Sequence, residues 1–216
     1  MKNYLVILML SFSNFGFSQN VIGFQFGGAL NLLSSTETVG FKPGANVSFT
    51  YQTTLKNKIQ MVFGLAYLQK GYLQISPITI DPLSSYMGSY ENSIDIQYLR
   101  LPVSVKIPLG NFRNGHYSFQ IGAYGSYRMN ATQQLLSDIQ STRDFTMNVH
   151  EVDWGTNGSF NVEFRLKDNL SCIGSFVFDA GLVDVIKYIP GSRNYGCGLM
   201  FGIQYHLYRI KLPLSN

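Results

Sequence analysis

Residues 153–166 read DWGTNGSFNVEFRL, and this stretch decides the fold class of the chain. Its side chains alternate between two faces with a period of two, which is the pattern of a β-strand. One face carries Trp154, Thr156, Gly158, Phe160, Val162, Phe164 and Leu166, and the other carries Asp153, Gly155, Asn157, Ser159, Asn161, Glu163 and Arg165. Alternation over 14 residues exceeds the usual strand of a soluble sheet. It matches a tilted strand that crosses a bilayer.

The same period recurs along the chain, as in residues 59–68 (IQMVFGLAYL) and 117–129 (YSFQIGAYGSYRM). We therefore expect an all-β fold, an eight-stranded antiparallel up-and-down transmembrane β-barrel, which is the smallest closed form. The eight strands are predicted near residues 21–30, 41–53, 59–71, 93–108, 117–129, 153–166, 170–181 and 194–210.

The predicted connections alternate in length. Short turns fall at residues 54–58, 109–116 and 167–169, and longer loops fall at 31–40, 72–92, 130–152 and 182–193. Short periplasmic turns and long outer loops are typical of outer-membrane barrels, so both termini are expected in the periplasm. Within the loop 130–152 we expect either strand that continues above the membrane or a short helix near residues 132–139.

The N-terminus has the three parts of a secretory signal peptide. Residues 1–3 form a short basic start, residues 4–10 (YLVILML) an apolar core, and residues 11–19 a small and polar end. We expect a signal peptide over 1–19 and one barrel domain over 20–216. No later run reaches the roughly 18 apolar residues of a spanning helix, and without one only a closed barrel satisfies its backbone in lipid.

Composition agrees with a membrane barrel and argues against a nucleic-acid partner. Charged residues make up 13% of the chain and aromatic residues 14%, with 21 glycines. Few charges and many aromatics suit a sheet with one face in lipid. The net charge of +4 is mild and scattered, so no nucleic acid is expected as a partner.

Several segments resemble one known family. Residues 98–108 (YLRLPVSVKIP) resemble its Tyr-Leu-x-(Ile/Leu)-Pro-x-x-x-Lys strand, and residues 41–51, 64–71, 153–166, 176–182 and 196–208 match in order. The chain thus resembles the PorT-like, OmpX-like outer-membrane β-barrel domain family, also called the porin family. The resemblance implies the fold and the outer membrane of a Gram-negative bacterium, but no activity. One departure is that the chain continues past Tyr208 to Asn216 instead of ending on an aromatic residue.

The side chains on the polar face of the predicted strands indicate what fills the interior of the barrel. A barrel this narrow is filled by side chains, and buried charges require partners. We therefore expect a lumen polar network in which Glu163 and Asp179 pair with some of Arg100, Lys106, Arg128 and Arg165. A narrow conduction path or a small-ligand pocket stays open as an alternative. Further inward positions are Gln25, Asn46, Ser48, Thr50, Gln52, Gln60, Ser104, Gln120, Asp153, Asn157, Asn161, Gln204 and His206.

Catalytic, metal and cofactor signals are weak, and none of these roles is expected. Of the three histidines, His116, His150 and His206, only His150 lies near acidic and hydroxyl neighbours at the predicted outer rim: Glu151, Asp144 and Ser141. This set is the candidate for a lipid-modifying enzyme. Cys172 and Cys197 lack metal spacing. Both occupy positions whose side chains face lipid, and they lie near opposite ends of neighbouring predicted strands. They are therefore expected to be too far apart to form a disulfide.

The sequence thus predicts a structural or surface-interaction role for a monomeric outer-membrane barrel. Its expected partners are outer-membrane lipid and a surface or secretion-apparatus protein. The alternatives are a component of a PorT-like secretion apparatus, a narrow porin, or a soluble lipocalin-like ligand binder. The last remains open because alternation alone does not say which face is inside.

Overall fold

The computed structural model describes residues 20–34, 39–55, 58–79, 87–136 and 141–207. The predicted signal peptide and the residues after 207 lie outside this part. The strands are β1 (Asn20–Ser34), β2 (Val39–Thr54), β3 (Gln60–Thr79), β4 (Met87–Phe112), β5 (Gly115–Leu136), β6 (Ser141–Asp144), β7 (Val152–Lys167), β8 (Leu170–Gly181) and β9 (Arg193–His206). A 3-10 helix, η2, spans Thr146–Asn148.

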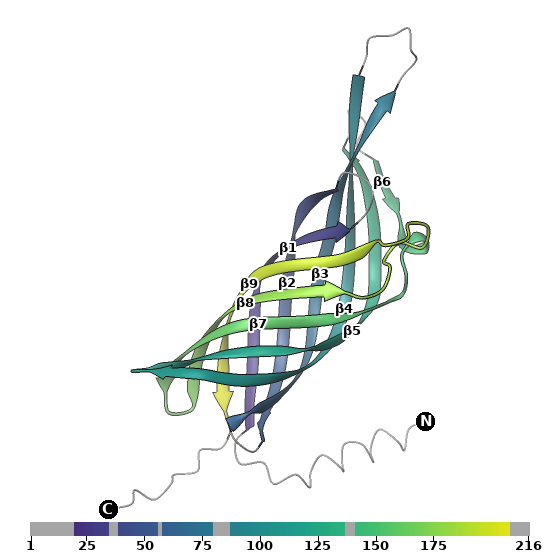
Figure 1. Cartoon of the computed structure of the whole chain (residues 1–216). Coiled ribbons are helices and arrows are strands. Elements are labelled where there is room, and N and C mark those ends of the chain that lie inside the picture. Colours follow the sequence, from purple (N-terminus) through teal and green to yellow (C-terminus); the bar gives the residue numbers. More distant parts are fainter. Residues whose placement is uncertain (1–19, 35–38, 56–57, 80–86, 137–140, 208–216) are drawn as a thin grey trace, which may run out of the picture.

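Eight of these strands close into an antiparallel barrel (Figure 1). The order runs β4-β3-β2-β1-β9-β8-β7-β5, and a β4–β5 pairing closes the ring. The short strand β6 pairs only with β5, outside the ring. The predicted fold class is therefore confirmed. No helix within the described ranges is long and apolar enough to cross a membrane.

The barrel has two different ends. The start of β1 and the end of β9 lie at the same end, as the pairing of Val21 with His206 shows. The short turns that follow β2, β4 and β7 lie at this end as well. We call this the turn end and the opposite one the loop end.

Two predicted loops are largely strand, which corrects the expected boundaries. Within 72–92, β3 continues to Thr79 and β4 begins at Met87, and these two residues pair. Within 130–152, β5 continues to Leu136, so the alternative of a strand that continues beyond the membrane is confirmed there. The alternative of a helix near 132–139 is wrong over residues 132–136, and 137–140 lie outside the described residues. The long β3–β4 hairpin rises beyond the rest of the barrel at the loop end (Figure 1).

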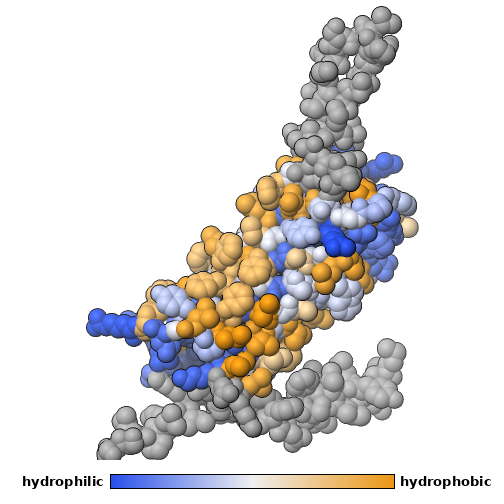
Figure 2. Space-filling view, in the orientation of Figure 1, coloured by the Kyte–Doolittle hydropathy of each residue, from blue (hydrophilic) through white to orange (hydrophobic). Residues whose placement is uncertain are grey.

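Alternation along the strands separates a lipid face from a lumen face. Large apolar side chains such as Phe26, Leu101 and Trp154 are 56–60% exposed on the outside. Their inward neighbours are buried and mostly polar, for example Lys106, Glu163 and Gln204. Figure 2 shows apolar surface across the middle of the visible face of the barrel, with hydrophilic surface at both ends. A lipocalin-like barrel places its large apolar side chains inside, so this structure does not favour that alternative.

Gly155 allows strand β7 to pack closely against a side chain that lies in the lumen. A Cβ atom on Gly155 of β7 would lie 2.3 Å from the Ala180 carbonyl oxygen and 2.4 Å from the Tyr124 hydroxyl. A side chain there would push Tyr124 out of its place. Because Tyr124 covers a lumen cation, this glycine helps to arrange the interior.

Candidate functional site

A carboxylate at the turn end organises the first polar layer of the lumen. Glu163 of β7 is 4% exposed and lies 3.3 Å from Lys106 Nζ. Its Oε2 is 3.3 Å from His116 Nε2 and its Oε1 is 3.4 Å from His206 Nε2. Lys106 also donates a hydrogen bond to Gln52 Oε1 at 3.2 Å. These four side chains, Glu163, Lys106, His116 and His206, are the Glu163 cluster, and they tie β4, β5, β7 and β9 together across the lumen.

The Glu163 cluster lacks the geometry of a catalytic triad. Ser171 Oγ lies 3.0 Å from His206 Nε2, the same ring nitrogen that faces Glu163. In a triad the acid holds one imidazole nitrogen while the other takes the serine proton. Here one nitrogen meets both groups, so the arrangement supports packing of the turn end and not nucleophile activation.

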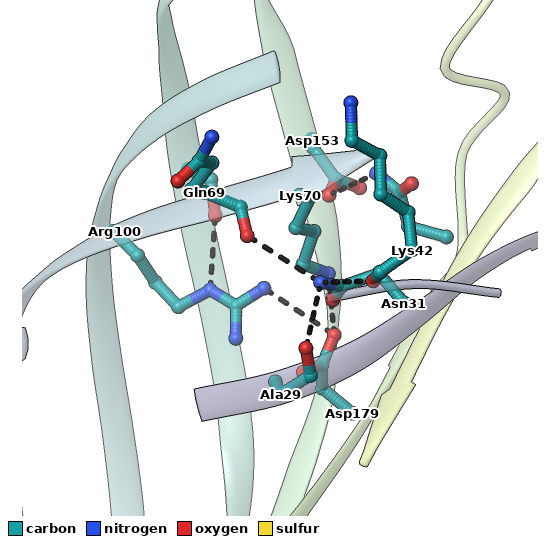
Figure 3. A network of polar contacts seen from close by, with 10 residues as sticks. Ala29, Asn31, Lys42, Gln69, Lys70, Arg100, Asp153 and Asp179 are labelled. Atoms are coloured by element: carbon teal, nitrogen blue, oxygen red, sulfur yellow. Dashed lines mark hydrogen bonds and ion pairs between the residues drawn. The ribbon is translucent and has the colours of Figure 1, made fainter. Parts of the chain in front are cut away.

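A second carboxylate organises a layer nearer the loop end (Figure 3). Asp179 Oδ2 lies 2.5 Å from Lys70 Nζ and 3.4 Å from Arg100 Nη2. The Arg100 guanidinium lies 3.6 Å from the centre of the Tyr124 ring, a cation–π contact, and its Nε donates to Ser126 Oγ at 3.2 Å. Lys70 is only 1% exposed. We call Asp179, Lys70, Arg100 and Tyr124 the Asp179 cluster.

A small cavity of about 100 Å³ lies between the two clusters. Polar side chains from many strands line it, including Gln25, Ser48, Ser104, Asn157 and Asn161. The described part of the lumen is therefore lined by polar side chains that leave this cavity between the two clusters.

Apolar side chains close the loop end. Residues 145–151 and 182–192 fold together over it as a loop-end lid, in which Val149 bridges Ile186 and His150 N donates to Val185 O at 2.9 Å. Under the lid lies a buried cluster made of Leu33, Leu68, Tyr72, Ile94, Ile96, Tyr98, Ala131, Val149, Val185 and Ile186. Arg128 Nη1 donates to the carbonyl oxygens of Thr146 and Val149, which fixes the lid on β5.

The predicted network residues divide between these places. Lys106 lies with Glu163, and Arg100 lies with Asp179. Arg128 reaches neither carboxylate, because its side chain binds lid carbonyls instead. Arg165 is exposed at the turn end and makes neither of these pairs.

Sequence reasoning missed Lys70, His116 and the role of His206 in these clusters. A signal for Lys70 was present, since it continues the inward parity of Gln60 and Leu68 along β3. However, Gln69, Lys70 and Gly71 close the predicted strand 59–71, and a polar run of this kind is typical of a strand end. His116 was placed in a turn, whereas β5 already begins at Gly115.

A family model now adds independent information. The model described as "Outer membrane protein beta-barrel domain" matches residues 13–187 of the chain. The chain belongs to this family. The molecule is thus a small outer-membrane β-barrel protein with a lumen filled by its own side chains. No curated protein sequence matches it.

Three solved structures are similar to this outer-membrane barrel at low identity. The attachment invasion locus protein Ail of Yersinia pestis, in complex with the heparin analogue sucrose octasulfate, is 10% identical, and the match covers 87% of this chain and 99% of that chain with a TM-score of 0.44. Neisserial surface protein A (NspA) is 11% identical, with coverage of 85% of this chain and 96% of that chain and a TM-score of 0.47. The outer membrane protein OprG from Pseudomonas aeruginosa is 11% identical, with coverage of 89% of this chain and 98% of that chain and a TM-score of 0.43. The family assignment rests on the sequence model, because all three TM-scores lie below 0.5.

Among the described side chains of the candidate enzyme site at the rim of this outer-membrane barrel, Asp144 contacts Thr146 and no ion pair joins it to His150. Asp144 Oδ1 accepts a hydrogen bond from Thr146 N at 2.8 Å. Hydrogen bonds from the Thr146 side chain and backbone hold the pKa of Asp144 below its usual value. Glu151 and His150 are exposed, and the side chain of Ser141 lies outside the described residues.

The two cysteines of the outer-membrane barrel are free and point outward. In the β8–β9 register Cys172 pairs with Ile203, whereas Cys197 pairs with Phe178. These positions are six residues apart along the strands, which is about 20 Å. That distance is far beyond the reach of a disulfide.

Proposed function

We propose that this outer-membrane barrel is a closed, monomeric membrane anchor that presents its loop end for structural or surface interactions. One observation carries the proposal: the lumen is blocked in succession by the Glu163 cluster, the Asp179 cluster and the loop-end lid. A blocked lumen does not favour a narrow porin. What remains available to a partner is the surface beyond the membrane.

The β3–β4 hairpin projects beyond the rest of the barrel on that side (Figure 1). Beyond the exposed apolar residues Tyr67 and Leu99, Gln69 of β3 donates a hydrogen bond to Asp95 of β4. From Tyr67 to the end of β3 at Thr79 the strand continues for 12 residues, or about 40 Å along its axis. This extension supports a display role better than a role confined to the bilayer.

Two measurements test the proposal together. Purified protein in planar bilayers is expected to show no single-channel steps. A variant in which residues 74–91 are replaced by a two-residue turn is expected to keep the heat-dependent gel shift of a folded barrel but to lose attachment to surfaces or partner cells. Defined conductance steps in the wild type, or full attachment by the shortened barrel, would contradict the display role.

A secretion-apparatus role is the second candidate, supported by the PorT-like resemblance of residues 98–108. In the structure, Arg100 and Lys106 of this motif are lumen ions of the two clusters. The motif therefore explains barrel packing as readily as membership of an apparatus. Comparing the secreted proteins of a deletion strain and its parent decides the matter, since unchanged secretion removes this candidate.

The export route and topology belong to the same proposal. Residues 1–19 act as a signal peptide, and the turn end faces the periplasm. Strand β1 begins at Asn20, directly after the expected cleavage region. N-terminal sequencing of the membrane form is expected to start near residue 19 or 20. Retention of Met1 would contradict processing.

A further inference from the structure

A second, larger cavity lies at the turn end and is separate from the lumen cavity. It has a volume of about 640 Å³ and opens between the β4–β5 turn and the β7–β8 turn. Its lining is mainly polar, and its charged or titratable members are Arg113, His116, Glu163, Arg165, Lys167 and Asp168. We call this cavity the turn-end vestibule. The closed-anchor role assigns it no function.

The frame of the vestibule is fixed by backbone and aromatic contacts. Arg165 N donates to Asn114 O at 2.8 Å, which joins β7 to the β4–β5 turn. A Cβ atom on Gly115 would lie 1.9 Å from the Glu163 carbonyl oxygen, so only glycine allows β5 to start this close to β7. The Phe112 ring packs 5.1 Å from the Phe164 ring on the outside. The turn that carries Arg113 is therefore held against the strand that carries Arg165.

The charge of the vestibule is predominantly positive. Arg113, Arg165 and Lys167 are exposed around it and outnumber the exposed carboxylate of the lining, Asp168. None of the three cations takes part in the ion pairs of Glu163. The carboxylate of Glu163 is already neutralised by the buried Lys106 ammonium. The rim cations thus create a field that favours an anion entering from the turn end.

We infer that the turn-end vestibule binds a phosphate group between Arg113 and Arg165. A guanidinium presents a planar fork of donors that matches phosphate oxygens, and two of them on facing, fixed segments favour this chemistry over a single point charge. The cavity volume falls in the range of small-ligand pockets. The phosphate comes either from a small soluble anion or from a lipid headgroup of the leaflet at the turn end.

Calorimetric titration with inorganic phosphate tests the site. The full mature barrel is purified in a maltoside detergent, which carries no phosphate, and sodium chloride at matched ionic strength is the blank. Wild type is expected to bind phosphate saturably, and the double variant R113Q/R165Q at least tenfold more weakly. The matched control R143Q/R193Q removes two exposed arginines at the loop end and is expected to bind like the wild type. The gel shift on heating checks that each variant is folded.

The same titration in nanodiscs of phosphatidylglycerol separates the two phosphate sources. Suppressed binding of inorganic phosphate there, with normal binding in maltoside, assigns the site to a lipid headgroup. Equal binding in both media assigns it to a soluble anion. The inference is overturned if wild type shows no saturable heat in maltoside, or if R113Q/R165Q and R143Q/R193Q bind phosphate equally.

Discussion

Replacing Asp179 by Asn is expected to destabilise the barrel far more than the same replacement at Asp95. The two aspartates offer a matched comparison, because each has a lysine Nζ at 2.5 Å. They differ in surroundings. Lys70 beside Asp179 is 1% exposed inside the lumen, whereas Lys42 beside Asp95 is 14% exposed. Asp179 also holds Arg100.

The expected loss of unfolding free energy follows from the lysine charge that remains buried without a partner. Asp179→Asn leaves the Lys70 ammonium buried without its carboxylate, and breaking a buried pair in this way costs about 3–5 kcal/mol. At Asp95 the remaining lysine reaches water, so the free energy of unfolding falls by only about 1 kcal/mol. The expected difference of at least about 2 kcal/mol exceeds a tenfold change in the unfolding constant.

Urea unfolding in lipid vesicles measures both values. Trp154 is the sole tryptophan and is 59% exposed on the lipid face, so its emission reports release from the membrane. The double variant Lys70→Met with Asp179→Asn is expected to recover at least about 1 kcal/mol over Asp179→Asn alone, because no ammonium is stranded. Equal costs at Asp179 and Asp95, or no recovery in the double variant, would refute the reasoning.

Three further predictions concern the lipid face, the packing and the lid. Val103→Arg lies near the middle of the apolar belt of β4 and is expected to lower the free energy of unfolding in vesicles by about 2–4 kcal/mol. Leu109→Arg at the edge of the belt is expected to lower it by only about 0–1 kcal/mol, and equal losses would argue against the membrane position. Gly155→Ala is expected to lose about 1–3 kcal/mol in urea unfolding because Tyr124 must move, whereas Gly110→Ala, with open space around its Cβ position, stays near wild type. Val149→Asp buries a charge under the lid and is expected to make the loop end sensitive to protease while the gel shift persists; unchanged digestion would contradict the lid packing.

Strand number and facing were predictable because the lipid imposes one requirement on every strand. Outward residues must be apolar and inward ones polar, so a period of two survives over long stretches. The predicted strand 153–166 differs from β7, Val152–Lys167, by one residue at each end. Placing the charges inside follows from the same rule.

The hairpin and the lid were not predictable from periodicity. Beyond the apolar belt the sequences of β3 and β4 lose their regular alternation of polar and apolar residues, and Pro77 and Gly88 are residue types that are common in loops. Pairing with the neighbouring strand keeps that segment extended. Likewise Val149 and Ile186 are isolated apolar residues in two separate loops, and only the folded arrangement brings them together.

The most direct test of the barrel and its facing returns to residues 153–166. Single cysteines placed along this stretch, in a background without Cys172 and Cys197, carry spin labels in lipid vesicles. Labels at even-numbered positions are expected to be accessible to oxygen in the lipid, and labels at odd-numbered positions are expected to be shielded, with a period of two throughout. Uniform accessibility, or the opposite alternation, would contradict a closed membrane barrel with a polar lumen.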